Sequence, residues 1–181
     1  QMVHFSDRAR RDGLLALEEE AKNIDDEFLR KGIQMAIDGM DPEVVREVLE
    51  TEIESIRERH KVGAKFFADA GAFSPTLGVL GTVIGLVHML ENLNDPSSMG
   101  PLIAAAFIAT LWGVMMANVL WLPIANKLKR LSAEELHYKS LVMEGILAIQ
   151  AGSNPRTVAD KLKSYLAPAE RAAVSDERKT A

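Results

Sequence analysis

Two long stretches of the chain lack the polar face that a soluble helix of the same length keeps. Gly71–Leu90 has 20 residues without a charge, and Pro96–Asn126 has 31. A helix of about 20 apolar residues rises about 30 Å, which is the thickness of the hydrocarbon core of a bilayer. We therefore interpret both stretches as transmembrane helices. The alternative interpretation is a helical hairpin buried in a soluble core.

Before the first stretch, apolar residues recur with helical spacing. Ser6 is a candidate N-cap for a helix over Asp7–Lys22, and a second short helix is predicted over Asp26–Ile37. Asp41 suits the cap of a third helix, and Pro42 suits its first turn. Because the helical pattern then continues, we expect one long helix to lead into the first apolar stretch.

The helical pattern also continues beyond the second stretch, to about Ala151, and a final helix is predicted over Pro155–Leu166. No strand is predicted. The fold class is therefore all-α, a membrane protein with two transmembrane helices that are extended by long cytoplasmic helices. The predicted divisions are a cytoplasmic helical region (1–65), a transmembrane helix (66–92), an external loop (93–100), a transmembrane helix (101–126), a cytoplasmic helical region (127–168) and a flexible tail (169–181).

Cations gather at the ends of the two stretches that face away from their connecting loop. The loop itself, from Glu91 to Gly100, has acidic residues and no Lys or Arg. The positive-inside rule then places both termini in the cytoplasm and the loop outside. The flanking cations are Arg57, Arg59, Lys61 and Lys65 before the first stretch and Lys127, Lys129 and Arg130 after the second.

The composition excludes several classes of function. The 181 residues include no cysteine, so a disulfide framework and a cysteine-ligated metal site are excluded. The formal net charge of −5 does not fit a nucleic-acid binder, which should have a basic surplus. No phosphate loop, zinc-protease motif or nucleophile elbow is present, and the four histidines are scattered. We therefore expect no enzyme activity and no cofactor.

Small residues line the first apolar stretch. Gly78, Thr82 and Gly85 share one helix face, and Gly81 lies beside them. Small residues at this spacing let another helix approach closely in lipid. The second stretch also carries small residues, so both helices are suited to tight packing. Two helices cannot use all of these faces on each other, which implies partners or further copies of the chain. A simple two-helix hairpin is the alternative.

Few polar groups lie inside the two stretches. Thr82 and Thr110 lie at similar depth, where their hydroxyls could hold water or an ion. Neither stretch contains a carboxylate, although moving a proton or sodium ion across a membrane generally needs an ionisable or strongly coordinating group. A partner chain would have to bring that acid. Pro75 and Pro123 each remove a helical hydrogen bond, so each is a bend point or a static kink.

Three segments resemble the MotA family of flagellar motor stator subunits. Ser74–Leu86 is similar to the third membrane helix of that family. Ala9–Glu20 resembles the start of its cytoplasmic loop, while Ala109–Gly113 and the pair Leu122-Pro123 match its fourth helix. The related TolQ and ExbB proteins share the glycine–threonine helix. The segment Ala9–Glu20 is what favours MotA.

The resemblance implies a fold and an assembly. A MotA subunit has four membrane helices, and this chain resembles the third and fourth. We therefore expect a segment with two further membrane helices before Gln1. Five such subunits would surround two copies of a MotB-like subunit, which would supply the membrane acid. The assembly would lie among the lipids of a bacterial inner membrane.

The resemblance also implies residue roles. Ion flow would rotate the ring around MotB, and its cytoplasmic part would push on the rotor protein FliG. By motif, the implied rotor contacts are Arg10 and Glu18, the mechanical hinges are Pro75 and Pro123, and the ion-path hydroxyls are Thr82 and Thr110. On this interpretation Arg10 and Glu18 are exposed opposite charges two helical turns apart. The alternative for them is a solvated helix face.

Other functions stay open from the sequence. One is a TolQ/ExbB-type energy transducer for processes at the outer membrane, and another is a passive membrane scaffold. The coupling ion is also open, because threonine hydroxyls can serve water-mediated proton delivery or coordinate sodium. We favour protons.

Overall fold

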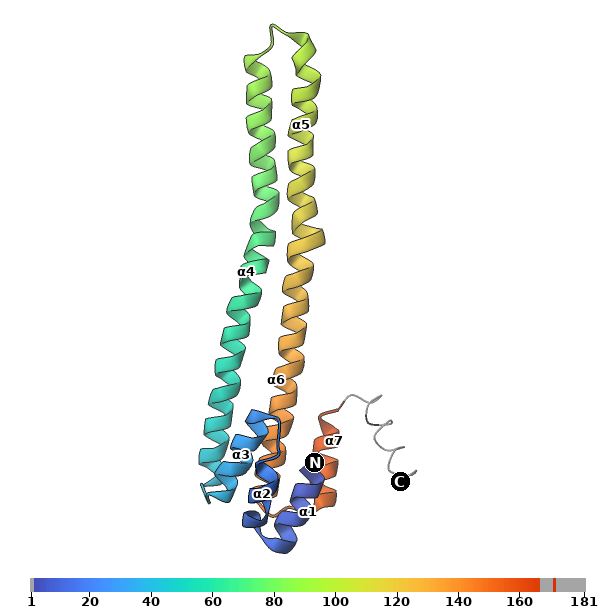
Figure 1. The fold of residues 1–181 in the computed structure, drawn as a ribbon. Coiled ribbons are helices and arrows are strands. Elements are labelled where there is room, and N and C mark those ends of the chain that lie inside the picture. The colour runs from blue at the N-terminus through green and yellow to red at the C-terminus, as the bar shows by residue number, and fades with distance from the viewer. Residues whose placement is uncertain (1, 167–170, 172–181) are drawn as a thin grey trace. The chain divides into compact units, whose positions relative to one another are not determined.

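A computed structural model describes residues 2–166 and 171, and every regular element in these residues is a helix (Figure 1). The all-α prediction is confirmed for this part of the chain. The predicted flexible tail, 169–181, falls outside the described residues except for Arg171. In order, the elements are α1 (Met2–Asp12), the 3-10 helix η1 (Leu14–Leu17), α2 (Glu18–Ala21), α3 (Glu27–Ile37), α4 (Pro42–Glu91), α5 (Pro96–Met115), the π-helix η2 (Met116–Trp121), α6 (Leu122–Gln150) and α7 (Pro155–Ser164).

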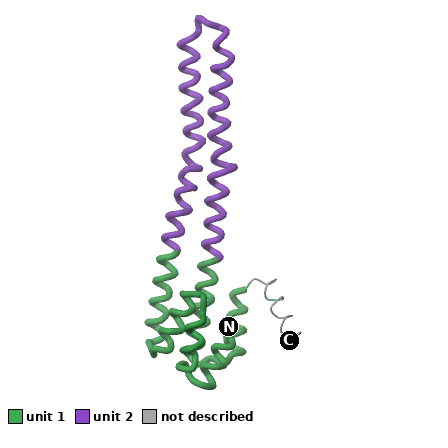
Figure 2. Tube along the Cα trace, in the orientation of Figure 1, with its two compact units in different colours: residues 1–56, 135–181 green, residues 57–134 purple. Residues whose placement is uncertain are grey.

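The chain divides into two compact units (Figure 2). The first comprises residues 1–56 and 135–181, and the second comprises residues 57–134. The long helices α4 and α6 each contribute to both units.

The first unit has an apolar core of its own. On α4, Val45 and Leu49 are spaced one turn apart and are fully buried, as the amphipathic pattern requires. Phe28 and Ile33 of α3 and Ile146 of α6 are also fully buried, and all five belong to one hydrophobic cluster. This core joins the short N-terminal helices to parts of α4 and α6.

The predicted helix over Asp7–Lys22 is wrong. Gly13 has φ +85°, a conformation that glycine adopts freely, and it ends the helix that begins at Met2. The chain then continues as η1 and α2. Ser6 is not an N-cap. It lies inside α1, is buried, and its hydroxyl donates to the carbonyl oxygen of Ser153 at 2.9 Å.

Aspartates cap the next two long helices. The cap at Asp41 was predicted, whereas Asp26 was predicted only as the first residue of its helix. Asp26 caps α3, since its carboxylate accepts from the backbone N–H of Phe28 at 2.9 Å and of Leu29 at 3.1 Å. Asp41 accepts from the N–H of Glu43 at 2.8 Å. The helix that follows, α4, runs for 50 residues, as predicted for one helix leading into the first apolar stretch.

The second unit is an antiparallel helical hairpin. Its first arm is the C-terminal part of α4, and its second is α5, η2 and the start of α6. Asp95 caps α5 by accepting from the N–H of Ser97 at 3.1 Å, so the helix begins at Pro96. Residues 92–95 connect α4 to α5. Hydrogen bonds from Ser97 lower the pKa of Asp95.

The hairpin exposes its apolar side chains instead of burying them. The most apolar 18-residue windows of its two arms have mean hydropathies of 1.6 and 2.0, and only 11% and 17% of the residues in those windows are buried. Leu77, Ile84 and Phe107 are among the exposed residues. Both arms are long and apolar enough to cross a membrane. This exposure contradicts the alternative of a hairpin buried in a soluble core.

Within the first unit, one carboxylate links three helices. Glu144 of α6 is 13% exposed and accepts from Arg46 of α4 at 3.0 Å and from Lys161 of α7 at 2.5 Å. Burial would raise the pKa of Glu144, but hydrogen bonds and charge attraction from Lys161 and Arg46 outweigh it and lower the pKa. The ionised form of Glu144 is thus the form that the folded state prefers.

We predict that Glu144→Gln destabilises the first unit by about 1–2 kcal/mol, because two charged hydrogen bonds are lost and both cations can still reach water. A group whose pKa is lowered on folding stabilises the protein above its unfolded pKa and loses that effect as the pH falls through the folded pKa. The loss in free energy of unfolding should therefore be complete at pH 7 and should shrink below pH 4.5, the ordinary pKa of glutamate. Thermal unfolding in detergent, followed by circular dichroism, measures this loss.

The control is Glu134→Gln on the same helix, whose carboxylate is 64% exposed and lies 3.6 Å from Arg130. An exposed pair of this kind contributes little, so its unfolding midpoint should match that of the unchanged protein. Equal midpoints for all three proteins at pH 7 would contradict the role given to Glu144.

Candidate functional site

The two arms of the hairpin come closest at a pair of glycines. A Cβ atom on Gly113 would lie 2.7 Å from the carbonyl oxygen of Ser74 and 2.8 Å from the Cα of Gly78. A Cβ atom on Gly78 would lie 3.0 Å from the carbonyl oxygen of Ala109. The obstructing atoms belong to the backbone, so only glycine fits both positions without moving a helix.

The remaining small residues of the predicted face also meet α5. A Cβ atom on Gly81 would lie 3.0 Å from the Cβ of Ala109, and one on Gly85 would lie 3.1 Å from the Cβ of Ala106. The structure therefore directs Gly78, Gly81 and Gly85 against the same neighbouring helix. Gly113 is among the small residues of the second stretch that the sequence indicates as suited to tight packing. Its signal is the spacing of Ala106, Ala109 and Gly113, which places three small residues on one face of α5.

The structure brings the two threonines together in this seam. The hydroxyls of Thr82 and Thr110 are in hydrogen-bond contact. The hydroxyl of Thr82 also lies 3.1 Å from the carbonyl oxygen of Gly78, on its own helix, and 3.0 Å from that of Ala106 on α5. Because a hydroxyl has one proton, Thr82 donates to one of these acceptors and can accept from Thr110. The pair forms a polar point between two apolar helices.

Each arm of the hairpin also has a segment near a proline where the helical hydrogen bonding is interrupted or displaced, and we call these the irregular segments. Pro75 lacks an N–H, so the carbonyl group of Gly71 loses its usual helical donor. Pro123 follows the π-helix η2, in which the N–H of Leu122 donates to the carbonyl oxygen of Ala117, five residues back. Pro123, which has no N–H, therefore lies at the junction between the π-helix and α6. The π-helix was not predicted.

The two irregular segments meet. A Cβ atom on Gly71 would lie 2.7 Å from Cδ2 of Leu122, and the rings of Phe67 and Trp121 have centroids 6.3 Å apart. Gly71, whose carbonyl group lacks a donor because of Pro75, therefore packs against Leu122, the first residue after η2. Whether Pro75 and Pro123 act as hinges stays a prediction.

The implied rotor-contact residues lie in the first unit. Arg10, near the end of α1, and Glu18, at the start of α2, are both exposed. They are not two turns apart on one helix, because the bend at Gly13 separates them. Their neighbours Arg8 and Glu20 form an ion pair. Within the described part of the chain, Arg10 and Glu18 form no ion pair, which leaves both charges available to another molecule.

No group of three or more metal-ligating side chains occurs among the residues that the structure describes. The site is therefore defined by helix packing, one hydroxyl pair and two prolines. An all-α fold with two long apolar helices, closely packed through small residues, is typical of a membrane protein.

Comparison with known proteins identifies the family. The profile of the MotA/TolQ/ExbB proton channel family matches residues 20–140. Motility protein A of Borreliella burgdorferi is 42% identical over 170 residues, which cover 94% of this chain and 65% of that protein. Motility protein A of Bacillus subtilis is 44% identical over 163 residues, which cover 90% and 60%. The chain belongs to the MotA/TolQ/ExbB family.

The fold agrees with this family. In the solved flagellar MotAB stator complex from Bacillus subtilis, the matching chain is 42% identical and superimposes with a TM-score of 0.87, over 94% of this chain and 67% of that one. The prediction of an all-α membrane protein with two transmembrane helices is thereby confirmed. The chain spans less than two thirds of the length of the two motility proteins named above.

We predict that Gly113→Ala destabilises the hairpin by about 1–3 kcal/mol, because the new Cβ atom must push two backbones apart. Both tryptophans of the chain, Trp112 and Trp121, lie in the hairpin, so thermal unfolding followed by tryptophan fluorescence measures this unit. The control is Gly63→Ala in α4, where a Cβ atom would meet nothing within 4 Å. Equal loss of stability in both variants would show that Gly113 does not set the helix spacing.

Proposed function

We propose that this chain is part of a stator subunit of a bacterial flagellar motor, in the inner membrane, that couples ion flow to torque on the rotor. The observation that carries the proposal is the agreement of both units with a MotAB stator chain. Membership of the family alone would also admit TolQ-type and ExbB-type transducers. The relatives described above are named for motility, which favours the stator.

The proposed partner in the membrane is a MotB-like subunit. Residues 71–90 and 96–126 contain no carboxylate, and Thr82 and Thr110 are already bonded to each other. The hairpin therefore offers oxygen atoms but no group that carries a proton through hydrocarbon. We assign that group to an acidic side chain of the partner, around which about five copies of this subunit form a ring. Both termini of the described hairpin face the cytoplasm.

The proposed contact with the rotor lies in the first unit. Arg10 and Glu18 are exposed and form no ion pair within the described residues. Charged contacts at the rim of an interface change the rate of encounter more than the affinity. Such a contact suits a rotor surface, of the FliG kind, that must be engaged and released repeatedly. The proposed hinges, Pro75 and Pro123, would let one part of the subunit move relative to another.

We predict that Arg10→Glu and Glu18→Lys each reduce swimming speed and torque at least severalfold in a strain whose own stator subunit is deleted, while membrane insertion stays normal. The reason is that each change reverses a charge offered to the rotor. A compensating charge reversal in the rotor protein should restore motility. The control is Lys22→Glu, an exposed charge reversal in the same region outside the implied contact. Undiminished swimming in both variants would contradict the rotor contact.

The proposed ion path gives a separate prediction. Thr110→Val and Thr82→Val each remove a hydroxyl from the seam, so torque should fall although both proteins still fold and assemble. Thr76→Val is the matched control, because Thr76 lies on the same helix as Thr82 and is exposed. We take the ion to be the proton, so swimming speed at fixed pH should not depend on external sodium. Full torque in the double variant Thr82→Val/Thr110→Val would favour a passive scaffold.

A further inference from the structure

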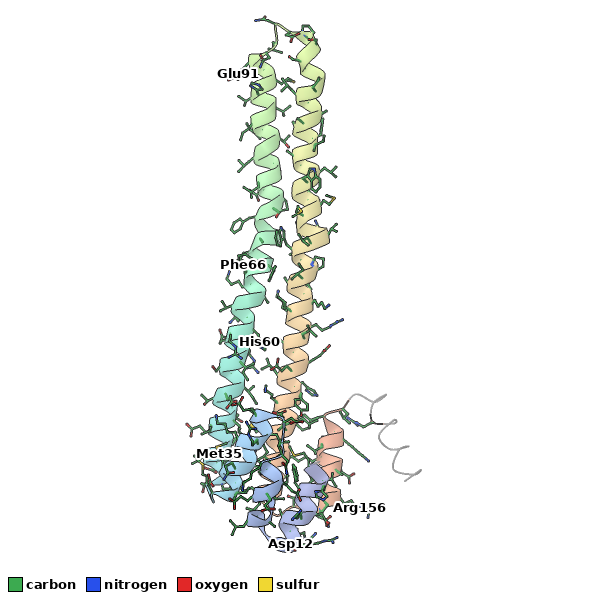
Figure 3. The ribbon with its side chains drawn as sticks, in the orientation of Figure 1. Asp12, Met35, His60, Phe66, Glu91 and Arg156 are labelled. Atoms are coloured by element: carbon green, nitrogen blue, oxygen red, sulfur yellow. The ribbon has the colours of Figure 1, made fainter. Side chains whose placement is uncertain are left out.

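A cleft of about 450 Å³ opens between α4 and α6 inside the second unit. It lies near the end of the hairpin that is opposite the connecting loop, at the level of His60, which Figure 3 labels. Cations come to it from both helices: Arg57, Lys61 and Lys65 from α4, and Lys129 from α6.

Lysine and arginine are the charged residues that line this cleft, in a chain that is acidic overall. The chain has 26 acidic and 21 basic residues, yet no carboxylate lines the cleft as the described residues form it. Lys61 and Lys65 pair with Glu58 and Asp69 at 3.1 and 2.7 Å, but these are exposed pairs on the helix surface and contribute little. Lys129 pairs with no carboxylate in the described part of the chain. The cleft is therefore suited to an anion.

The floor of the cleft is apolar. Ala64 is 3% exposed and lies at the base, with Ala68 beside it. Nδ1 of His60 lies 3.1 Å from the hydroxyl of Ser132, which joins α4 to α6 within the lining. Lysine stems add further apolar surface below their charged ends. A cationic rim above an apolar floor fits an amphiphile better than a free, fully hydrated ion.

The depth of the cleft matches the headgroup layer of a bilayer. Lys129 lies three residues past Asn126, about 4.5 Å beyond the second uncharged stretch. Ser132, which lies opposite His60 of α4, is six residues past Asn126, so Lys61 next to His60 lies at a level about 9 Å beyond that stretch, within reach for a side chain that extends along the helix. The polar layer on each face of a bilayer is about 5–8 Å thick. The mouth of the cleft therefore opens among lipid phosphates.

We propose that this cleft binds the headgroup phosphate of an anionic glycerophospholipid from the cytoplasmic leaflet. Lys61 and Lys129 approach the phosphate from two different helices, and the glycerol and first acyl carbons cover Ala64 and Ala68. The lipid would then bridge α4 and α6 and stabilise their spacing. This site is separate from the hydroxyl pair and from the rotor contact, so it does not depend on the proposed motor function.

The test compares two double variants of the full-length protein by native mass spectrometry in detergent, titrated with dioleoylphosphatidylglycerol or dioleoylphosphatidylcholine. Lys61→Gln/Lys129→Gln removes two charges from the cleft. Arg59→Gln/Lys127→Gln removes two charges from the same helices, each two residues away and outside the lining. A third variant, Ala68→Leu, fills the cleft without changing any charge.

The unchanged protein and the Arg59/Lys127 variant should bind phosphatidylglycerol more tightly than phosphatidylcholine. The Lys61/Lys129 variant should lose about fivefold in affinity per lysine, roughly 25-fold in all, and Ala68→Leu should also weaken binding. Equal losses in the two double variants would mean general attraction between charges and would overturn the site. The site would also be overturned if the unchanged protein bound glycerol 3-phosphate or a polyglutamate peptide as tightly as phosphatidylglycerol, because neither is a lipid.

Discussion

The close crossing of two backbones at Gly78 and Gly113 is the constraint on which the rest of the hairpin depends. In lipid no hydrophobic force drives two helices together, so packing between small residues must do so. A Cβ atom on Gly113 would lie 2.7 Å from a carbonyl oxygen of the opposite helix, which shows how little space remains. The same approach brings the hydroxyl of Thr82 to 3.0 Å from the carbonyl oxygen of Ala106. The polar pair in the seam is therefore a consequence of the glycines, and widening the crossing would separate it.

The irregular segments adjoin this tight seam, because Pro75 follows Ser74, whose carbonyl oxygen meets Gly113, and the π-helix begins three residues after Gly113. Gly71 is seven residues from Gly78, about 10 Å along α4, and it packs against Leu122 where the π-helix ends. A helix bends most easily where a hydrogen bond is missing or displaced, and here both arms have such a place at the same level. On α4 no proline follows Pro75 up to Glu91, so the segment that carries Gly78, Gly81 and Gly85 has no such interruption. The hairpin thus places a regular helical segment beside an interrupted one, which is the arrangement that the proposed hinge requires.

Local signals predicted the fold well, and contacts between elements were harder to predict. The caps at Asp26 and Asp41 and the unbroken course of α4 follow from residues close in sequence. Gly13 was missed because a lone glycine in a helical pattern is tolerated in many helices, and only its φ of +85° reveals the bend. The π-helix was missed because a uniformly apolar stretch looks the same for either hydrogen-bond interval.

The contact of Thr82 with Thr110 depends on the register of two helices, which the loop length and the glycines set together. The rotor-contact residues came from the family resemblance alone, since their exposure is ordinary for charged residues.

The hydrogen bonds of the threonine pair give its two members different freedom. Thr82 has two carbonyl oxygens and Thr110 within reach, so its hydroxyl stays satisfied if one contact is lost. Thr110, within the described residues, bonds only to Thr82 through its hydroxyl. Exchanging that bond for one to water or to a partner's carboxyl group changes the free energy little, because one hydrogen bond replaces another. Thr110 is therefore the hydroxyl that can turn toward an incoming group, while Thr82 holds the seam. It follows that removing the hydroxyl of Thr110 should affect ion flow more than helix packing, whereas removing that of Thr82 should affect both.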